Sequence, residues 1–210
     1  MKSEIKKLLH RIKKHYFYGY ISTTQLQAFT LLPFQNLSSE RLLLRKLTTN
    51  DVNEMFAIRS SADVMKYIPR PLCKTKEEVF ELITLMQNKL ETNEACNWAI
   101  TLKNDDKLIG FIGHYNIKWE HFRSEIGYML APKYHGKGIA TESTKLLVDF
   151  GFNKMKMHSL EAIIDPANIA SARVLEKNGF VKEAHLKQNE FYNGKFLDTI
   201  IYSLIKKAEQ

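Results

Sequence analysis

The sequence predicts a single α/β domain with a mixed, largely antiparallel sheet of six to seven strands flanked by helices. The 210 residues suffice for one well-packed domain and are too few for two ordinary ones. Hydrophobic residues make up 44% of the chain, which supports one sizeable core. Runs with strand character alternate with runs whose apolar residues recur every three or four positions, so both element types are expected.

Residues 1–35 are expected to form a basic and aromatic extension of unknown role, and residues 36–210 the domain. Residues 1–14 contain six basic residues and one acidic residue, which accounts for +5 of the net charge of +8. A solvated basic helix face is the simpler interpretation of this segment. Its charge would also suit attraction to RNA, ribosomes or anionic lipid.

The first half of the domain is predicted to hold two helices and a three-stranded meander. A strand over residues 42–47 precedes a helix that begins at residues 48–51. Thr75 and Glu78 have the spacing of a capping box, and the apolar pattern after them predicts an amphipathic helix. The three strands of the meander are expected over residues 97–102, 107–119 and 123–130, with residues 104–106 in the first turn.

In the second half of the domain, Pro132 ends the third strand of the meander, and a glycine-containing turn leads into a helix. Gly179 is expected to end a later helix in the left-handed conformation. The elements after Pro132 are predicted as helix, strand, helix and two late strands, over residues 141–152, 158–164, 168–178, 180–184 and 199–205.

Composition excludes several classes of protein. No apolar run approaches the roughly 20 residues of a membrane span, and no secretory signal is present, so a cytoplasmic protein without a membrane partner is expected. Cys73 and Cys96 lack metal-ligand spacing and are expected to be plain thiols, with no metal required. The protein is expected to be a monomer or a homodimer.

Residues 134–142 lie between a predicted strand and a predicted helix, a position where backbone N–H groups and the positive helix end can face an anion. Gly136 and Gly138 allow a phosphate to approach the backbone closely. Ala140 keeps the first helical turn small, and Lys137 adds a cation at the rim. A GxG turn alone is weak evidence, because glycine in a tight turn often has only a steric role.

Two motifs in the right order make the interpretation more specific. His135, Gly138 and Ala140 fall on the pattern [QR]-x-x-G-x-[GA], and residues 168–180 follow N-x-x-S-x-x-V-x-x-K-x-G-F. Over residues 38–206 the sequence therefore resembles the GNAT superfamily of N-acetyltransferases, especially its ribosomal-protein N-terminal (serine/alanine) acetyltransferase branch. The resemblance implies a GNAT-like fold with acetyl-CoA as co-substrate, held at a split between the strands of residues 123–130 and 158–164.

The resemblance also implies which residues contact acetyl-CoA. The strand before the loop would pair with the pantetheine arm, and a backbone N–H near Met129 would stabilise the oxyanion if a bulge turned it outward. Asn168 is expected to cap its helix and to contact the same arm. The expected cofactor-binding residues are Met129, Leu130, His135, Gly136, Lys137, Gly138, Ile139, Ala140, Thr141 and Asn168.

The sequence departs from the family pattern at two positions. His135 stands where the motif has Gln or Arg, which predicts weaker or pH-sensitive contacts with the co-substrate. Leu175 stands where many members have a tyrosine that protonates the leaving thiolate, so a tyrosine acid is excluded there. Ser171 matches the serine of the ribosomal branch and is predicted to hydrogen-bond the thiolate, with an ordinary surface serine as the alternative.

Three carboxylates compete for the role of general base. Glu142 lies at a predicted helix start, where a negative charge is favoured structurally, so it is assigned to the helix dipole. Glu190 precedes an aromatic-x-Asn-Gly segment like the one in the ribosomal branch, and it is the preferred base. Glu125 on the central strand is the alternative. A buried aromatic core explains Trp98, His114, Tyr115 and Trp119 more simply than substrate binding does.

The expected reaction is direct transfer of an acetyl group to a primary amine. An α-amino group has a pKa of about 7.7 to 8.0 against about 10.4 for lysine, which favours a protein N-terminus in a site with one glutamate base. A small-molecule amine, such as an antibiotic or metabolite, is the alternative acceptor. A non-catalytic CoA-binding protein or a ribosome-associated RNA binder is the remaining alternative. The presence of Ser171 and Glu190 disfavours a protein that only binds CoA.

Overall fold

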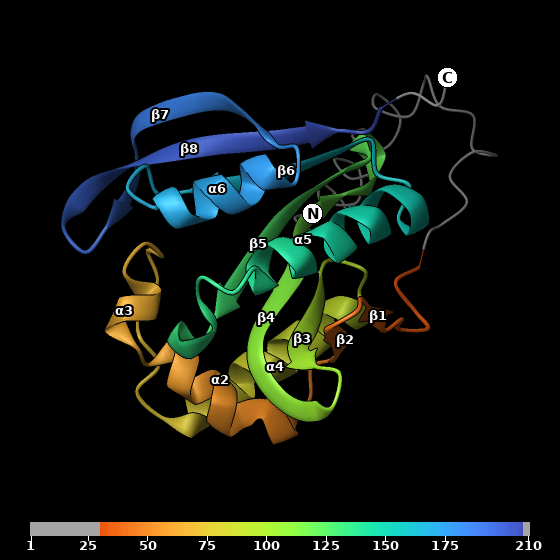
Figure 1. The fold of residues 1–210 in the computed structure, drawn as a ribbon. Coiled ribbons are helices and arrows are strands. Elements are labelled where there is room, and N and C mark those ends of the chain that lie inside the picture. The colour runs from red at the N-terminus through yellow and green to blue at the C-terminus, as the bar shows by residue number, and fades with distance from the viewer. Residues whose placement is uncertain (1–29, 208–210) are drawn as a thin grey trace, which may run out of the picture. The chain divides into compact units, whose positions relative to one another are not determined.

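The computed structural model describes residues 30–207, and a compact folded unit begins at Leu31 (Figure 1). The apolar and aromatic patterns within residues 1–20 lie outside the described residues. The sheet has eight strands in the order β1-β2-β3-β4-β5-β6-β8-β7. The strands are β1 (Leu37–Ser38), β2 (Leu42–Lys46), β3 (Cys96–Leu102), β4 (Asp105–Lys118), β5 (Arg123–Leu130), β6 (Ser159–Ile164), β7 (Val181–Tyr192) and β8 (Lys195–Ile205).

The sheet is largely antiparallel, as expected, because among the described strands only β5 and β6 run parallel. It has one strand more than the expected six to seven. The additional strand β1 is two residues long, which is too short to give a periodic signal in the sequence. The turn between β3 and β4 also differs, because Leu102 pairs with Asp105 and the turn is Lys103-Asn104 rather than residues 104–106.

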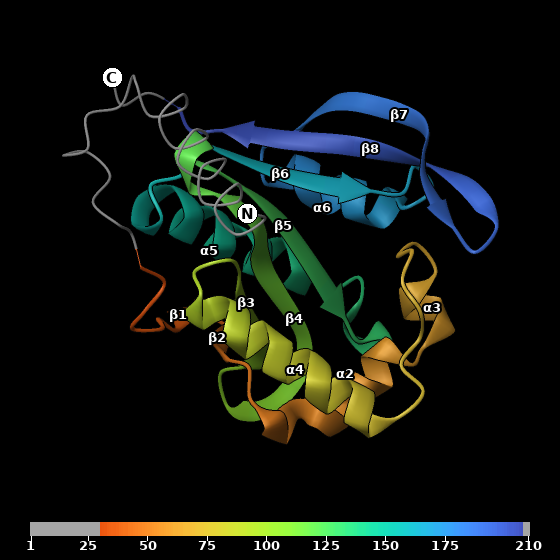
Figure 2. The same cartoon turned by 180° about the vertical axis from the view of Figure 1, so that it is seen from behind.

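Helices cover both faces of the sheet. They are α2 (Val52–Arg59), α3 (Ala62–Met65), α4 (Lys76–Glu91), α5 (Ile139–Asp149) and α6 (Ile169–Lys177), with 3-10 turns at Thr49–Asp51, Trp119–His121 and Pro132–Tyr134 and a π-helical turn at Phe150–Lys154. Helices α5 and α6 lie on the face turned to the viewer in Figure 1, and α4 lies on the opposite face, which Figure 2 shows from behind.

The core therefore has two layers. On one face, buried Met55 and Ile83 of α2 and α4 pack with Ala99 and Phe111 of the central strands. On the other face, buried aromatic side chains form a cluster in which Trp98 lies edge-on to Phe150, with ring centroids 5.0 Å apart. His114 is fully buried in the same cluster, as the sequence predicted. These two layers hold β4 and β5 rigidly between the helices.

Residues just after position 30 already contact the folded unit. Leu31 is buried, and the ring of Phe34 lies 5.4 Å from that of Trp98. The indole nitrogen of Trp98 donates a hydrogen bond of 2.8 Å to the carbonyl oxygen of Gln35. The predicted domain start at residue 36 therefore lies a few residues inside the segment that packs on the sheet.

The two late strands are much longer than the sequence predicted. They form one hairpin in which Tyr192 pairs with Lys195, so the turn is Asn193-Gly194. Both turn residues have positive φ, 51° and 79°, as a two-residue hairpin of the type favoured by Asn-Gly requires. The expected strands stopped at residue 184 and resumed at residue 199, because the residues between them are mostly polar and exposed and show no apolar alternation.

The pairing of β5 and β6 covers only the beginning of each strand. The parallel register runs from Arg123 opposite Ser159 to Glu125 opposite Glu161, and within residues 30–207 no further pair joins the two strands. Beyond this point β5 stays paired with β4, and β6 with β8. The sheet is therefore split between two central strands, where the sequence predicted the split, and the strands diverge in Figures 1 and 2.

No helix within residues 30–207 combines the length and the apolar character that crossing a membrane requires.

Candidate active site

A cavity of about 750 Å³ occupies the split between β5 and β6. One wall consists of Gly127, Tyr128 and Met129 of β5, and the facing wall consists of residues 162–164 of β6. The facing backbone edges of the two strands lack a strand partner here, so their N–H and C=O groups can pair with amides of a bound molecule. Asn168, Ser171, Glu125 and Glu190 also line this cavity.

The loop before α5 has the geometry of an anion cradle. Gly136 and Gly138 have φ of 72° and 77°, and Gly138 is the N-cap of α5. A Cβ added at Gly136 would meet no atom within 4 Å, so the loop is open on that side. In the described part of the chain, no side chain caps this helix, which leaves its first N–H groups free to face a phosphate. The loop therefore has the geometry that binding of a phosphate-like anion requires.

Arg41, which directly precedes β2, holds this loop in place. Its guanidinium donates to the Glu142 carboxylate, with N···O distances of 2.8 and 2.5 Å, and to the carbonyl oxygen of Lys137 at 3.2 Å. Ser39 donates a second short hydrogen bond to Glu142 at 2.5 Å. Burial raises the pKa of Glu142, but the hydrogen bonds from Ser39 and Arg41 lower it further than burial raises it. Glu142 thus has a structural role, which agrees with its assignment to the helix start.

The side chains of the predicted loop residues point to different places. The His135 ring nitrogen Nε2 lies 2.8 Å from the carbonyl oxygen of Leu130, so the imidazole folds back onto the end of β5. The Lys137 amine lies 5.7 Å from the Tyr134 ring centroid. Ile139 is buried in the core. None of residues 135–141 lines the cavity at the sheet split, so the loop lies outside that cavity.

The start of α6 brings two predicted residues together. The Asn168 side chain accepts a hydrogen bond of 3.1 Å from the Ser171 N–H, which confirms Asn168 as the N-cap. The Tyr128 hydroxyl lies 3.5 Å from the carbonyl oxygen of Ser171, and burial raises the pKa of Tyr128 to about 12. Leu175, which stands at the position of the family tyrosine, is fully buried. A hydrogen bond between the Ser171 and Tyr128 side chains partly opposes the rise in the pKa of Tyr128.

Both candidate bases line the cavity from different strands. Glu125 lies on β5, where Asn116 donates a hydrogen bond of 2.7 Å to one of its carboxylate oxygens. Burial raises the pKa of Glu125, and the Asn116 hydrogen bond opposes that shift. Glu190 is half-buried on β7, directly after an irregularity in the pairing with β8. Among the described residues, its carboxylate has no hydrogen-bond partner. The cavity thus has one carboxylate on the central strand β5 and one on the edge strand β7.

Two expectations about this wall need correction. Tyr115 is not part of a closed aromatic core but lines the cavity, because the strand shifts register after it and ends the regular pairing of β4 with β5. Met129 pairs regularly with Phe111, and the irregularity lies between Tyr115 and Lys118 instead. A bulge near Met129 that would turn an N–H toward an oxyanion is therefore absent from the β4–β5 pairing.

Comparison with known proteins identifies the family. The acetyltransferase (GNAT) domain family matches residues 41–181. The chain belongs to this family. The uncharacterized N-acetyltransferase YoaA of Bacillus subtilis (strain 168) is 32% identical over 176 residues, which cover 84% of this chain and 99% of YoaA. The protein is therefore a GNAT N-acetyltransferase, and its fold class is the one that the sequence predicted.

Other GNAT relatives are similar over most of this chain. The crystal structure of a GNAT acetyltransferase from Bacillus anthracis is 31% identical with a TM-score of 0.74, covering 81% of this chain and 98% of that one. The spermidine N(1)-acetyltransferase of Escherichia coli (strain K12) is 27% identical over 78% of this chain and 85% of its own. The ribosomal-protein-S5-alanine acetyltransferase of Vibrio fischeri is 26% identical with a TM-score of 0.69, covering 81% and 96%. Relatives thus include enzymes named for a polyamine and for a protein.

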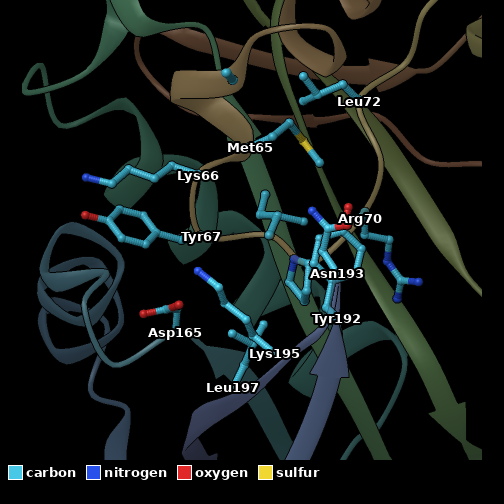
Figure 3. A pocket seen from close by; sticks show the side chains of 13 residues that line it. Met65, Lys66, Tyr67, Arg70, Leu72, Asp165, Tyr192, Asn193, Lys195 and Leu197 are labelled. Carbon is cyan, nitrogen blue, oxygen red and sulfur yellow. The ribbon is translucent and has the colours of Figure 1, made fainter.

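A second cavity of this GNAT acetyltransferase, about 390 Å³, lies between the segment after α3 and the tip of the β7–β8 hairpin. Figure 3 shows Lys66, Tyr67 and Arg70 from the first segment across from Asp165 and Lys195. Tyr67, Ile68, Pro69 and Arg70 line both cavities, so the second cavity adjoins the first. The two segments are about 125 positions apart, and no local motif in either one indicates that they share a cavity.

Proposed function

We propose that the protein transfers the acetyl group of acetyl-CoA to the α-amino group of a peptide or protein N-terminus. The observation that carries this proposal is the single cavity at the sheet split, which brings together Asn168, Ser171 and Glu190 beside the free edge of β5. These residues come from two elements, α6 with its N-cap and β7, and all line the same space. The adjoining second cavity supports an acceptor longer than a small amine, because it extends the space past the β7–β8 hairpin.

In this proposal acetyl-CoA is the co-substrate. Its pyrophosphate would face the N–H groups at the start of α5, where Gly136 leaves the backbone open. Its pantetheine amides would pair with the free edge of β5 near Met129. The thioester supplies an activated acetyl group, and most contacts with the co-substrate come from the backbone. Substitution of one loop side chain should therefore matter less than loss of a glycine.

Glu190 is the proposed general base. Its two carboxylate oxygens have no partner within residues 30–207, whereas one oxygen of Glu125 accepts the hydrogen bond of Asn116. The amine would form a C–N bond with the acetyl carbonyl carbon as the C–S bond breaks, and Glu190 would take the amine proton. The Ser171 hydroxyl would hydrogen-bond the sulfur that leaves as thiolate. Glu125, the alternative base, has a raised pKa and lines the same cavity.

A small-molecule amine is the second candidate acceptor, because a spermidine N(1)-acetyltransferase is 27% identical to this chain. A peptide N-terminus and a polyamine differ in the number of positive charges that they carry into the cavity. A polyamine is a polycation, whereas the acceptor side of the cavity carries Arg59, Arg70 and Lys89 beside its carboxylates. These cations repel a polycation, whereas Glu94, Glu125 and Glu190 of the same wall attract it, so the acceptor test decides between the two candidates.

The test compares acceptors for the wild-type enzyme with acetyl-CoA. One peptide has a free N-terminus and no lysine, a second has a blocked N-terminus and one lysine, and spermidine is the third acceptor. We expect acetylation of the first peptide, with the mass increase on its N-terminal residue in tandem mass spectrometry. Faster turnover of spermidine than of any free peptide would contradict the proposal.

A further inference from the structure

Arg59 is a buried cation without a charged partner. It ends α2 and is 8% exposed. Its guanidinium has weak partners only, namely the Met65 sulfur at 3.1 Å and the Pro71 carbonyl oxygen at 3.4 Å. The Nε atom is buried without a hydrogen-bond partner. Within residues 30–207, no carboxylate forms an ion pair with Arg59.

This arrangement is unusual on physical grounds. An arginine side chain stays protonated in proteins, so Arg59 cannot lose its charge on burial. A buried charge without a partner strongly destabilises a protein. The C-terminus of α2 stabilises a cation only weakly by comparison, and Nε has no hydrogen-bond acceptor there. An anion bound beside the guanidinium would offset the free-energy cost of burying this charge.

The cavity gives such an anion access to Arg59. Arg59 lines the cavity at the sheet split together with Tyr115 and Glu125. Burial raises the pKa of Tyr115, the charge of Glu125 adds to this shift, and the charge of Arg59 opposes it, so both charges act at the same phenol. The guanidinium therefore belongs to the wall of the cavity that holds the candidate bases, on the side of α2 rather than of the α5 loop.

Arg70 supplies a second cation. It is exposed, lines both cavities and, in the described part of the chain, forms no ion pair. Figure 3 shows Arg70 at the pocket that Lys66 and Lys195 also line, with Asp165 as the only carboxylate among the labelled residues. An acceptor that reaches the split from the hairpin side thus passes Arg70 before it reaches Arg59.

We propose that Arg59 and Arg70 form an anion subsite that binds a carboxylate of the acceptor, so that the preferred acceptor is a peptide with an acidic residue next to its reactive N-terminus. This inference rests on the proposed function and specifies its substrate class. The planar guanidinium fork matches a carboxylate in a bidentate geometry, and both Arg59 and Arg70 line the cavity at the sheet split. A carboxylate held there would leave the amine near Glu125 and Glu190.

The main experiment measures kcat/KM for three peptides that differ only at the second residue, which is Asp, Asn or Lys. We expect the wild-type enzyme to prefer the Asp peptide over the Asn peptide by roughly tenfold to a hundredfold, because hydrogen bonds to a charged group are lost. The Lys peptide should be the poorest acceptor. Arg59→Met should remove most of the preference for Asp, and Arg59→Lys should restore part of it.

Matched variants control for indirect effects. Arg70→Gln should reduce the preference for Asp without abolishing it, because Arg70 is exposed to water. Lys103→Met, at the exposed turn between β3 and β4, removes a cation that lines neither cavity and should leave the preference unchanged. Circular dichroism of Arg59→Met checks folding. If Arg59→Met does not fold, the Asp preference of Arg70→Gln decides: an undiminished preference overturns the subsite.

A second measurement does not depend on catalysis. Succinate should raise the Tm of the wild-type enzyme more than its neutral analogue succinamide does at equal ionic strength, and Arg59→Met should lose this difference. Equal effects of the two probes together with equal kcat/KM for Asp and Asn peptides would overturn the subsite while leaving peptide acetylation intact.

The outcome also separates this inference from the proposed function. If no peptide is acetylated but a small amine is, the proposed function fails. The subsite then stands if β-alanine is acetylated faster than ethylamine and succinate still stabilises the wild type, because the carboxylate then comes from a free amino acid. It falls if ethylamine is preferred.

Discussion

His114 on β4 lies against Ser124 on β5, with 2.9 Å between Nδ1 and the hydroxyl oxygen, and both residues are fully buried. The other ring nitrogen, Nε2, lies 3.1 Å from the carbonyl oxygen of Leu147 on α5. Because a carbonyl oxygen only accepts, Nε2 carries the proton, and the Ser124 hydroxyl donates to Nδ1. The neutral imidazole thus joins the two central strands to the helix that begins at the anion cradle.

This contact predicts loss of stability in mild acid. Burial lowers the pKa of His114 to about 4, against an unfolded value near 6.5, although the hydrogen bond to Leu147 opposes the shift. The unfolded chain therefore binds the proton first, so the stabilisation is complete above pH 6.5 and is lost as the pH falls toward 4. The loss should approach roughly 3 kcal/mol. Urea unfolding across this range measures it.

Two comparisons separate His114 from other groups. His158→Gln removes an exposed histidine and should leave the pH dependence unchanged. The raised pKa of Glu125 acts in the opposite direction, because a carboxyl with a raised folded pKa stabilises the fold at low pH and loses this effect as the pH rises. A His114 imidazole that titrates near 6.5 in the folded protein by NMR would contradict the prediction.

Gly138→Glu should abolish the rise in Tm that acetyl-CoA causes. The substitution places bulk and negative charge at the N-cap of α5, where the phosphates are proposed to lie. Gly194→Glu is the matched control, because Gly194 also has positive φ, 79° against 77°, but lies at the hairpin turn. Both variants carry similar backbone strain. Equal binding of acetyl-CoA by Gly138→Glu and wild type in calorimetry would refute the loop assignment.

Glu190→Gln should lower turnover by roughly 10² or more at neutral pH, because the variant keeps the shape of the side chain and loses the base. Turnover should recover in part at alkaline pH, where the amine is deprotonated by solvent. The measurement is a pH–rate profile on an acceptor that the wild type uses, with Glu125→Gln measured in parallel. Unchanged turnover in Glu190→Gln together with a collapse in Glu125→Gln would assign the base to β5.

Ser171→Ala should lower turnover at every pH and leave binding of acetyl-CoA close to that of wild type. Its hydroxyl is proposed to contact only the leaving sulfur, whereas its N–H, which bonds Asn168, is retained in the variant. Kinetics with acetyl-CoA as the varied substrate separate the two effects. A rise in KM for acetyl-CoA with unchanged kcat would instead assign Ser171 to binding.

Removal of residues 1–29 should leave acetyl-CoA binding and the Tm near their wild-type values, since the compact unit begins at Leu31. Removal of residues 1–35 should lower the Tm by roughly 10 °C, because it exposes the contacts of buried Leu31 and removes the acceptor for the Trp98 indole. Differential scanning calorimetry compares the two. Equal Tm values for both truncated proteins would place the domain start at residue 36.

Local signals were enough for much of the fold. The Thr75 side chain accepts the N–H of Glu78, and Asn168 accepts that of Ser171, as the two expected caps require. Gly179 has φ of 85° at the end of α6. These features depend on residues three to four positions apart, so neighbouring residues alone specify them. The late hairpin was underestimated because its exposed strands lack apolar alternation, although Asn193-Gly194 is a strong hairpin signal.

The sequence by itself determined the GNAT family, the order of the elements and the loop that fits a phosphate, because each depends on short motifs of neighbouring residues. Only the tertiary structure decided which carboxylates face the cavity, that Arg41 holds Glu142 across 101 positions, and that Arg59 is buried without a charged partner. Burial and pairing of charges depend on which distant segments meet. The electrostatic environment of the cavity wall around Arg59 and Arg70 therefore depends on the tertiary fold and not on a local sequence pattern.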